Sequence, residues 1–311
     1  MTIRASEWIW QDGRLVPWAE ATVHVLTHAL HYGSSWFEGI RVYDTNRGPC
    51  FFRLDEHVRR LLESARIHRC PVPWSKEELI AACHQVVAAN GLARAYVRPL
   101  VFRGYGTLSV DPTETPTQVV VAAVEWGTYL GAEGLESGVD TCVSSWQRVA
   151  PNTIPPQAKA GGNYLSSTLI HMEARRLGFD EGIGLAPDGT VGEGAGENIF
   201  VVREGVLRTP PESGSILPGL TRDAVFHLAH DLGLEVREGP IAREALYSAD
   251  EIFLTGTAVE IMPVRSVDRL EVGAGGRGPI TQRIQGAFFG LFDGSTIDTR
   301  GWLQRVRAEQ P

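Results

Sequence analysis

Apolar residues recur every three or four positions in two stretches of the first half of the chain, and this period predicts amphipathic helices. The first stretch reads "LDEHVRRLLESARIH" and carries its charged residues on the opposite face. Its apolar face is formed by Val58, Leu61, Leu62 and Ala65. The second predicted helix runs from about Ser75 to Asn90 and ends at Gly91, with Ser75 and Glu78 in a capping box.

Short apolar runs separated by turn residues predict strands. Two such runs flank Asp12-Gly13 in "WIWQDGRLVPW", which is a strong hairpin signal, and "GIRVYDTNRGPCFFR" repeats the pattern with a looser turn at 46–48. Further strands are predicted in "AYVRPLVF" and "TQVVVAAVEW". The glycine-rich "WGTYLGAEGLESG" then interrupts the pattern. We therefore expect a small N-terminal domain at 1–125, an interdomain linker at 126–136 and a larger domain at 137–311.

The second half opens with a strand in "GVDTCVSSW" and continues into the loop "RVAPNTIPPQAKAGG", whose three prolines exclude a helix or a central strand. A helix follows in "NYLSSTLIHMEARRLGF", with Asn163 as its N-cap and Gly178 as its end. Strands are then predicted in "GIGLA", "NIFVV", "VLRTP", "EIFLTG" and "IMPVRSV", and helices in "TRDAVFHLAHDLG" and "TQRIQGAFFGLF". Because strands and helices do not alternate regularly, the pattern predicts an α+β fold in two domains.

The composition and net charge indicate which kinds of molecule the protein binds. The 311 residues are 43% hydrophobic, which suits a globular chain, and the net charge of -8 gives no basic surface for nucleic acid. A small-molecule or protein partner is therefore expected. The start of the chain lacks the apolar segment of a signal peptide, and no apolar run approaches the roughly 18 residues that span a membrane, so we expect a cytoplasmic protein. The spacing of Cys50, Cys70, Cys83 and Cys142 is typical of buried thiols.

Lysine is rare in this chain. Lys76 and Lys159 are the two lysines among 29 basic residues, and the other 27 are arginines. Lys76 lies in the predicted capping box, whereas Lys159 lies among small residues in "QAKAGGNY". A lysine amine, unlike an arginine, can lose its proton and act as a nucleophile toward a carbonyl group. Lys159 is therefore a candidate catalytic residue, and the alternative is an exposed loop lysine, as most lysines are.

The segment "VGEGAGENIF" places Glu193 and Glu197 among glycines. Its glycines precede a predicted strand, whereas the dinucleotide-binding fingerprint requires them to follow one and to open a helix, which argues against an oxidoreductase of that class. A tight turn of this kind can bury a carboxylate beside a protonated ring nitrogen. The alternative is a glycine-rich hairpin with two solvated glutamates.

Two further turns are candidate anion sites. "LPGLTRDAV" places Gly219, Leu220 and Thr221 at the start of a predicted helix, where backbone N–H groups favour a phosphate. "LTGTAVE" offers Thr255, Gly256, Thr257 and Ala258 just after an apolar strand. Arg60, on the first predicted helix, is a candidate charge partner for the same phosphate, with Arg59 as the alternative inward residue.

The sequence lacks the motifs that several other classes of enzyme require. The histidines at 24, 28 and 31 have no carboxylate or cysteine partner at ligand spacing, which favours a structural role over a metal site. No GxSxG elbow, P-loop or HExxH motif occurs in the chain. By contrast, a reactive lysine, a carboxylate in a tight turn and two anion-binding turns together indicate a site for pyridoxal phosphate.

The ordered motifs give the chain a family resemblance. It resembles the branched-chain amino acid aminotransferases of the fold-type IV pyridoxal phosphate enzymes, from "HVLTHALHYGSSWFEGIRVY" through "APNTIPPQAKAGGNYLSS", "GEGAGENIF" and "LPGLTRD" to "LTGTAVEI" and "GPITQRIQGAFF". The resemblance covers nearly the whole chain. It implies a small N-terminal α/β domain, a larger C-terminal β-barrel-like domain with helices, and a homodimer that transfers amino groups from leucine, isoleucine or valine to 2-oxoglutarate.

The resemblance also implies roles for residues of this sequence. Lys159 is implied as the catalytic residue that binds the cofactor covalently. Cofactor contacts are implied for Lys159, Glu193, Tyr164, Arg60, Leu220, Thr221 and Thr257. Substrate contacts are implied for Phe37, Tyr96, Arg98, Trp126, Tyr129, Tyr164, Thr257 and Ala258, and for Tyr32 and Val110 of a neighbouring subunit. Arg98 is implied as the partner of the glutamate γ-carboxylate.

Two features leave alternatives open. "RGYGTLSVDP" carries Thr107, Leu108 and Ser109 where some relatives have more glycine, which bears on the shape of the loop that presents Val110 and so on specificity. The cofactor machinery is shared with sister enzymes, the D-amino acid aminotransferases and the aminodeoxychorismate lyases. A non-catalytic carrier of the cofactor is the alternative from another class.

Overall fold

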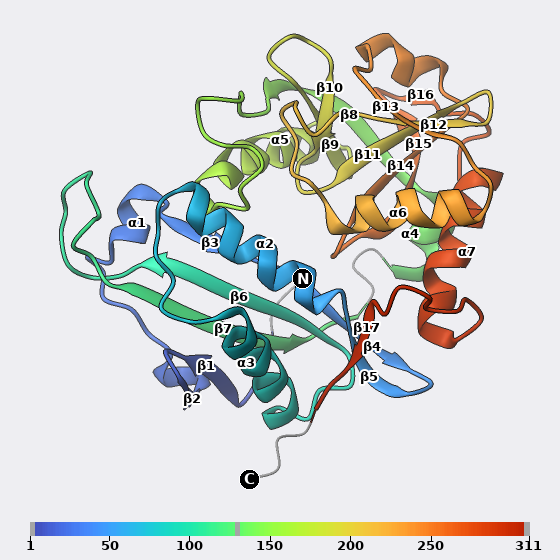
Figure 1. The fold of residues 1–311 in the computed structure, drawn as a ribbon. Coiled ribbons are helices and arrows are strands. Elements are labelled where there is room, and N and C mark those ends of the chain that lie inside the picture. Colours follow the sequence, from blue (N-terminus) through green and yellow to red (C-terminus); the bar gives the residue numbers. More distant parts are fainter. Residues whose placement is uncertain (1–3, 128–130, 308–311) are drawn as a thin grey trace. The chain divides into compact units, whose positions relative to one another are not determined.

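The chain forms two compact units in a computed structural model that describes residues 4–127 and 131–307 (Figure 1). The first unit contains the described parts of Met1–Gly127, Ala158–Gly162 and Phe292–Pro311. The second contains those of Thr128–Gln157 and Asn163–Leu291. Ala158–Gly162, the segment with Lys159, thus belongs to the first unit although its neighbours along the chain belong to the second.

The first unit is built on an antiparallel sheet, which has eight strands among the described residues. Their order is β17 (Leu303–Arg305), β5 (Gly48–Phe52), β4 (Ile40–Thr45), β6 (Ala95–Arg103), β7 (Thr117–Glu125), β1 (Trp8–Gln11) and β2 (Arg14–Pro17), with β3 (Ser35–Phe37) also paired to β6. The helical elements are η1 (Trp18–Glu20), α1 (His28–Tyr32), α2 (Leu54–Ile67) and α3 (Lys76–Ala89).

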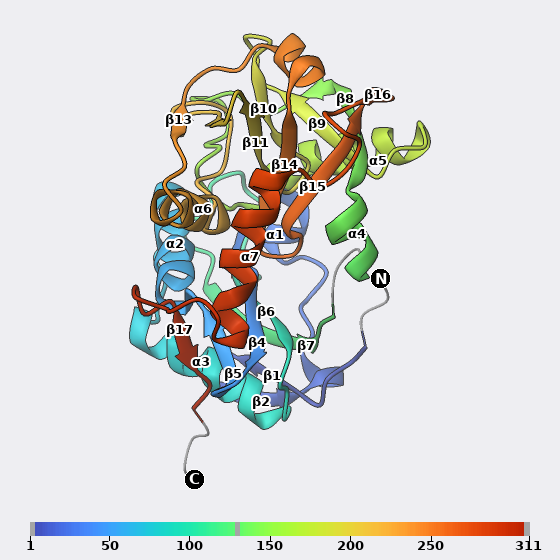
Figure 2. The same ribbon diagram turned by 90° about the vertical axis from the view of Figure 1, so that its right-hand side faces the viewer.

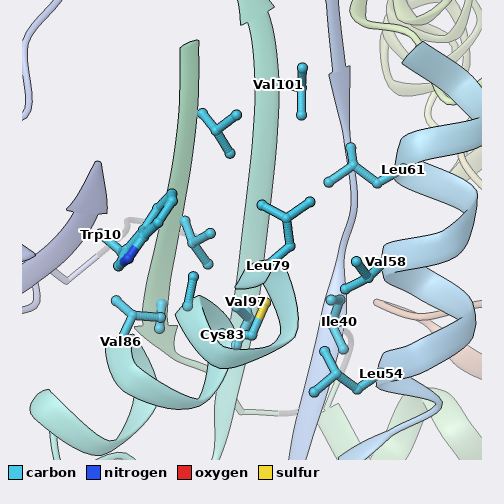
Figure 3. Close-up of a cluster of buried hydrophobic side chains, with 14 of the residues drawn as sticks. Trp10, Ile40, Leu54, Val58, Leu61, Leu79, Cys83, Val86, Val97 and Val101 are labelled. Atoms are coloured by element: carbon cyan, nitrogen blue, oxygen red, sulfur yellow. The ribbon is translucent and has the colours of Figure 1, made fainter. Parts of the chain in front are cut away.

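Helices α2 and α3 cover one face of this sheet (Figure 1). In Figure 3, Leu54, Val58 and Leu61 of α2 and Leu79, Cys83 and Val86 of α3 face Ile40, Val97 and Val101 of the strands. Burying one such apolar side chain contributes about 1.5–3 kcal/mol. Along β6 every second residue enters this core, so Tyr96 and Arg98 are on the opposite face of the sheet.

Several predicted elements of the first unit are confirmed. Helix α2 has the expected inward face, with Leu62 partly buried at its margin. The Ser75 capping box forms in full, because the side chains of Ser75 and Glu78 each accept a backbone N–H of the other residue. Asp12 and Gly13, both with positive φ, join β1 to β2 as the hairpin signal predicts.

The second unit is built on a mixed sheet that forms a half-barrel and has nine strands among the described residues. Their order is β10 (Val191–Gly194), β9 (Glu181–Leu185), β8 (Val139–Gln147), β15 (Glu260–Val267), β14 (Glu251–Gly256), β11 (Asn198–Arg203), β12 (Val206–Thr209) and β13 (Val236–Glu238), with β16 (Leu270–Glu271) paired to β15. Strand β8 runs parallel to both β9 and β15. The expected α+β fold with a barrel-like C-terminal sheet is confirmed.

Five helical elements lie wholly or mainly in the second unit. They are α4 (Gly131–Ser137), α5 (Tyr164–Arg176), α6 (Leu220–Asp231), η3 (Arg243–Ser248) and α7 (Pro279–Asp293), and the short η2 (Gly161–Asn163) precedes α5. Helix α5 packs on β8 and β9, and α6 packs on β14. Figure 2 views the unit from the side of α7, whose Gln285 donates to the carbonyl of Ile261 in β15.

Two details differ from the sequence expectations. Asn163 is the N-cap residue of α5, as predicted, but its side chain makes no cap hydrogen bond; its amide donates instead to the carbonyl of Pro155 and holds the proline-rich loop. Residues 131–136 of the stretch predicted as a linker belong to α4. The domain bounds expected from the sequence stay a prediction. None of the helices in the described parts of the chain has the length and apolar character that a membrane-spanning segment needs.

Candidate functional site

Lys159 is held in the first unit by its backbone. Its N–H donates to Ser64 Oγ of α2 at 3.0 Å, and its carbonyl accepts the N–H of Phe37 at 3.1 Å. The next residue, Ala160, forms a β-bridge with Trp36. The proline-rich loop therefore ends as an extended segment alongside β3, and this local pairing fixes the position from which the Lys159 side chain starts.

The Phe37 ring contacts two cations. Lys159 Nζ lies 5.0 Å from the ring centroid, and Arg98 Cζ lies 4.6 Å from it. A cation above an aromatic face is attracted by the ring quadrupole. Phe37 therefore brings an amine and a guanidinium, two groups expected to act on different parts of a substrate, to one apolar ring.

Tyr96 and Trp126 extend this aromatic surface. Their ring centroids are 4.7 Å apart, and Arg98 Cζ also lies 5.3 Å from the Tyr96 ring. Gly39 makes room for the tyrosine, because a Cβ at this position would lie 1.8 Å from Tyr96 Oη. The structure thus brings together Phe37, Tyr96, Arg98, Trp126 and Lys159, which were all predicted as site residues.

Arg60, the predicted phosphate partner, is the inward arginine of α2. Its Nε donates to Glu38 Oε1 at 2.7 Å and its Nη2 to Glu38 Oε2 at 2.9 Å. His57 Nδ1 lies 2.7 Å from the same Oε2. Arg59, the alternative, is exposed and lies 3.9 Å from Glu63. Glu38 and His57 were not predicted from the sequence, although Glu38 had a signal: it is a carboxylate inside the apolar stretch "WFEGIRV".

Burial and the neighbouring charges shift the pKa values of Glu38 and His57. Burial alone raises the pKa of Glu38, but the charges and hydrogen bonds of Arg60 and His57 outweigh burial and hold that pKa well below its usual value. Burial lowers the pKa of His57, the Glu38 carboxylate opposes this shift, and the charges of Arg60 and Lys159 add to it. The cluster therefore contains an ionised Glu38 and a neutral His57 whose Nδ1–H donates to it.

Tyr32 and Val110 lie on an exposed part of the first unit. Val110 is 79% exposed, and Tyr32 Oη donates to the carbonyl of Leu108. In the loop "RGYGTLSVDP", the Ser109 N–H donates to Thr107 Oγ1 at 3.0 Å. His28 is buried and lies 3.0 Å from the Ser109 carbonyl. The hydroxyl of Thr107 and the imidazole of His28 therefore restrain the loop that presents Val110.

Glu193 lies at the centre of a buried network in the second unit. Its Oε1 accepts Arg148 Nη2 at 2.5 Å, and its Oε2 accepts Asn198 Nδ2 at 3.0 Å and the N–H of Leu217 at 3.1 Å. The hypothesis of two solvated glutamates is therefore wrong for Glu193, which is 4% exposed. Arg148 and Asn198 were not predicted as site residues: Arg148 lies outside the motifs, and Asn198 lies in "VGEGAGENIF", where only the two glutamates stood out.

The other predicted residues of the second unit lie at element ends. Leu220 and Thr221 are the first two residues of α6, whose cap Gly219 makes no side-chain cap hydrogen bond. Thr257 and Ala258 form the turn between β14 and β15, and Tyr164 is the first residue of α5. Tyr129, predicted as a pocket residue, lies outside the described residues. Leu220 and Thr221 thus lie at a helix start, the position named by the anion prediction.

In the part of the chain that the structure describes, no three histidine, cysteine, aspartate or glutamate side chains lie close enough together to hold a metal ion. The predicted structural role of the histidines agrees with the contacts of His28, which also lies 2.7 Å from Ser34 Oγ. All four cysteines are buried and free, as expected.

Residues 35–267 match the family described as amino-transferase class IV. The chain is 57% identical over 307 residues to the branched-chain-amino-acid aminotransferase of Escherichia coli K12, covering 98% of this chain and 99% of that protein. A crystal structure of the Escherichia coli enzyme superposes with a TM-score of 0.96 at 56% identity, covering 97% of this chain and 100% of that one. The branched-chain amino acid aminotransferase of Thermobaculum terrenum, solved in its PLP form, gives a TM-score of 0.90 at 35% identity, covering 97% of this chain and 99% of that one.

Proposed function

The chain belongs to the family of class IV aminotransferases, and from this premise we propose that it transfers amino groups between branched-chain amino acids and 2-oxoglutarate. The substrates are L-leucine, L-isoleucine and L-valine, and the products are the branched-chain 2-oxo acids and L-glutamate, formed reversibly by a ping-pong route. The observation that carries the proposal is the Phe37 ring, which contacts the amine of Lys159 and the guanidinium of Arg98.

The cofactor is pyridoxal phosphate, which supplies an electron sink for the pair released when the substrate loses its Cα proton. The described residues fit such a group. Glu193 is a buried acceptor for a protonated ring nitrogen, and α6 begins without a side-chain cap. Thr255 Oγ1, buried on the strand paired with Asn198, has no hydrogen-bond partner among the described residues. Buried polar atoms are normally satisfied, so this hydroxyl supports a polar ligand in the second unit.

Within the second unit we assign Glu193 to the ring nitrogen and Tyr164 to the phenolic oxygen of the cofactor. Leu220, Thr221 and Thr257 contribute backbone or hydroxyl donors to the phosphate, and Thr257 and Ala258 also hold the substrate α-carboxylate. Helix starts favour anions because their first N–H groups lack partners inside the helix and the helix dipole is positive there.

Within the first unit we assign Lys159 the covalent attachment of the cofactor and the proton transfer at the substrate Cα. Arg60 binds the phosphate. Phe37 and Trp126 contact the branched side chain, together with Tyr129 and Tyr164, and Tyr96 contacts the α-carboxylate. The exposed Arg98 guanidinium can pair with a γ-carboxylate, which lets glutamate replace a branched apolar substrate.

We also propose a homodimer and a cytoplasmic location. The first unit exposes Val25, Leu30, Leu108 and Val110 by more than half of their surface, and apolar side chains exposed together favour burial against another chain. Tyr32 and Val110 lie in this exposed region and are assigned to the Arg98 side of the neighbouring subunit's site. The buried, free cysteines support a reducing compartment.

The decisive experiment starts from the purified protein. Its visible spectrum, recorded before and after addition of L-leucine, reports cofactor binding and the first half-reaction. A coupled assay then compares L-leucine with D-alanine as amino donor, each with 2-oxoglutarate. Transfer from L-leucine supports the proposal. Transfer from D-alanine alone indicates a D-amino acid aminotransferase. A protein that stays colourless after pyridoxal phosphate is added contradicts the proposal.

A further inference from the structure

We propose that Arg148 is a positioning residue that acts through Glu193 and keeps the proton shared with the cofactor on the ring nitrogen. The inference deepens the proposed function and rests on its assignment of Glu193 to that nitrogen. The inference rests on hydrogen bonds in the second unit. Arg148 donates to one carboxylate oxygen of Glu193 and is held in place by further hydrogen bonds.

Arg148 is anchored at both its backbone and its guanidinium. It directly follows β8, and its N–H donates to the carbonyl of Leu185 in β9 at 2.9 Å. Its Nη2 donates to Glu193 Oε1 at 2.5 Å, and its Nη1 donates to Ser167 Oγ of α5 at 2.8 Å. The residue is 8% exposed. The cation therefore has a fixed place beside one carboxylate oxygen.

Two glycines make room for the Arg148 stem. A Cβ at Gly184 of β9 would lie 3.0 Å from both Cγ and Cδ of Arg148, and a Cβ at Gly192 of β10 would lie 3.2 Å from Cγ. Both distances are tighter than ordinary van der Waals contact. The glycines of "GIGLA" and "VGEG" thus leave a channel across two strands, and an arginine side chain fills it.

The second oxygen of Glu193 is held separately. Oε2 accepts Asn198 Nδ2 and the N–H of Leu217, and Asn198 Nδ2 also donates to the carbonyl of Leu217. These neutral donors orient the carboxylate and tie it to the segment that leads into α6. Arg148 adds the element that they lack, a full positive charge beside Oε1.

The sign of the effect follows from the position of this charge. When a proton is shared between Glu193 and a ring nitrogen, moving it from the carboxylate to the nitrogen carries positive charge away from the guanidinium. Arg148 favours that direction, because like charges repel and the site is buried. The Glu181 carboxylate, whose charge acts on the neighbouring Glu197, opposes it. Without the guanidinium, the proton would move toward Glu193 and the neutral nitrogen would be a weaker electron sink.

The test uses the holoenzyme loaded with pyridoxal phosphate labelled with 15N at the ring nitrogen. The 15N chemical shift is read without an amino acid, so it does not depend on amino transfer. In Arg148→Gln the signal should move toward that of unprotonated pyridine, because an opposite charge beside a carboxylate changes the proton equilibrium by roughly 10- to 1000-fold. Arg148→Lys, which keeps the charge, should restore part of the wild-type signal.

Two controls make the outcome specific. Arg265→Gln removes another arginine of the same sheet, paired with Asp140, and should leave the 15N signal in place. Ser167→Ala keeps the charge but removes the Nη1 anchor, and it should move the signal part of the way even if Arg148→Gln does not fold. An unchanged signal in a folded Arg148→Gln, or in Ser167→Ala where that variant alone folds, overturns the proposal. Failure of wild-type amino transfer would instead count against the proposed function.

Discussion

Glu38 receives one edge of the Arg60 guanidinium through both of its carboxylate oxygens. The Nε–Oε1 distance is 2.7 Å, the Nη2–Oε2 distance is 2.9 Å, and Glu38 is fully buried. Two parallel hydrogen bonds fix the plane of the guanidinium as well as its position. The residue assigned to the cofactor phosphate is therefore itself oriented by a buried carboxylate that the sequence motifs did not reveal.

Replacing Glu38 with glutamine should weaken the binding of pyridoxal phosphate more than that of pyridoxal. The amide cannot receive both guanidinium donors, so Arg60 loses its fixed orientation toward the phosphate, which pyridoxal lacks. Disrupting a buried ion pair should also lower the free energy of unfolding by about 3–5 kcal/mol. Fluorescence titration of the cofactor-free protein gives both dissociation constants, and urea unfolding gives the stability.

The control for Glu38→Gln is Arg59→Gln on the exposed face of the same helix. Its weak pair with Glu63 should contribute only about 0–1 kcal/mol to stability. The ratio of the two dissociation constants should stay as in the wild type. If Glu38→Gln weakened both ligands equally, Glu38 would have a general structural role and no specific role toward the phosphate.

Replacing Lys159 with alanine should abolish amino transfer while the fold persists. The Lys159 contacts to Ser64 and Phe37 are made by its backbone and survive the substitution. Loss of the proton transfer alone lowers the rate by roughly 10²- to 10⁴-fold. Turnover with L-leucine is measured beside the far-ultraviolet circular dichroism of both proteins. Lys159→Arg is the matched variant, since it keeps a cation beside Phe37 yet should be equally inactive; activity in Lys159→Ala would refute the assignment.

Replacing Arg98 with alanine should damage the glutamate half-reaction far more than the leucine half-reaction. Only glutamate loses a charged partner, and a hydrogen bond to a charged group contributes about 1.5–3 kcal/mol, or roughly 10- to 100-fold in kcat/KM. Single-turnover absorbance changes with each amino acid give the two values. Arg94→Ala removes an exposed arginine of the same unit, 3.8 Å from Asp44, and should change neither. Equal losses in both half-reactions of Arg98→Ala would disprove this role.

Patterns among neighbouring residues predicted the helices and strands well. They could not predict contacts between residues that are far apart in the sequence. The apolar period of α2 and the capping box at Ser75 depend on residues three or four positions apart. Arg148 and Glu193, by contrast, are 45 positions apart, and only the pairing of β8, β9 and β10 brings them into contact. The same holds for Lys159, whose partner Ser64 is 95 positions away. Motifs could therefore nominate Lys159 and Glu193 but not Ser64 and Arg148, which hold them from distant parts of the chain.

The free energy of unfolding of the cofactor-free protein should fall as the pH rises, because Glu197 then ionises in a buried position. Burial, and then the charges of Glu181 and Glu193, raise the pKa of Glu197 to about 8, although the Gly196 N–H and Arg148 act in the opposite direction. Because the folded-state pKa lies above the unfolded value, the folded protein binds this proton more tightly. The resulting stabilisation is complete at a pH below about 4 and is lost as the pH rises toward and through about 8.

Glutamine at position 197 cannot ionise, so Glu197→Gln should gain stability over the wild type as the pH rises from 5 to about 8.5. Urea unfolding at both pH values measures the difference. Gln Oε1 can still accept the Gly196 N–H that Glu197 Oε2 accepts, so the turn is preserved. Glu244→Gln, at an exposed position of η3 in the same unit, should show the same difference from wild type at both pH values. A Glu197→Gln difference that is independent of pH would show that this carboxylate is already ionised at pH 5 in the folded protein.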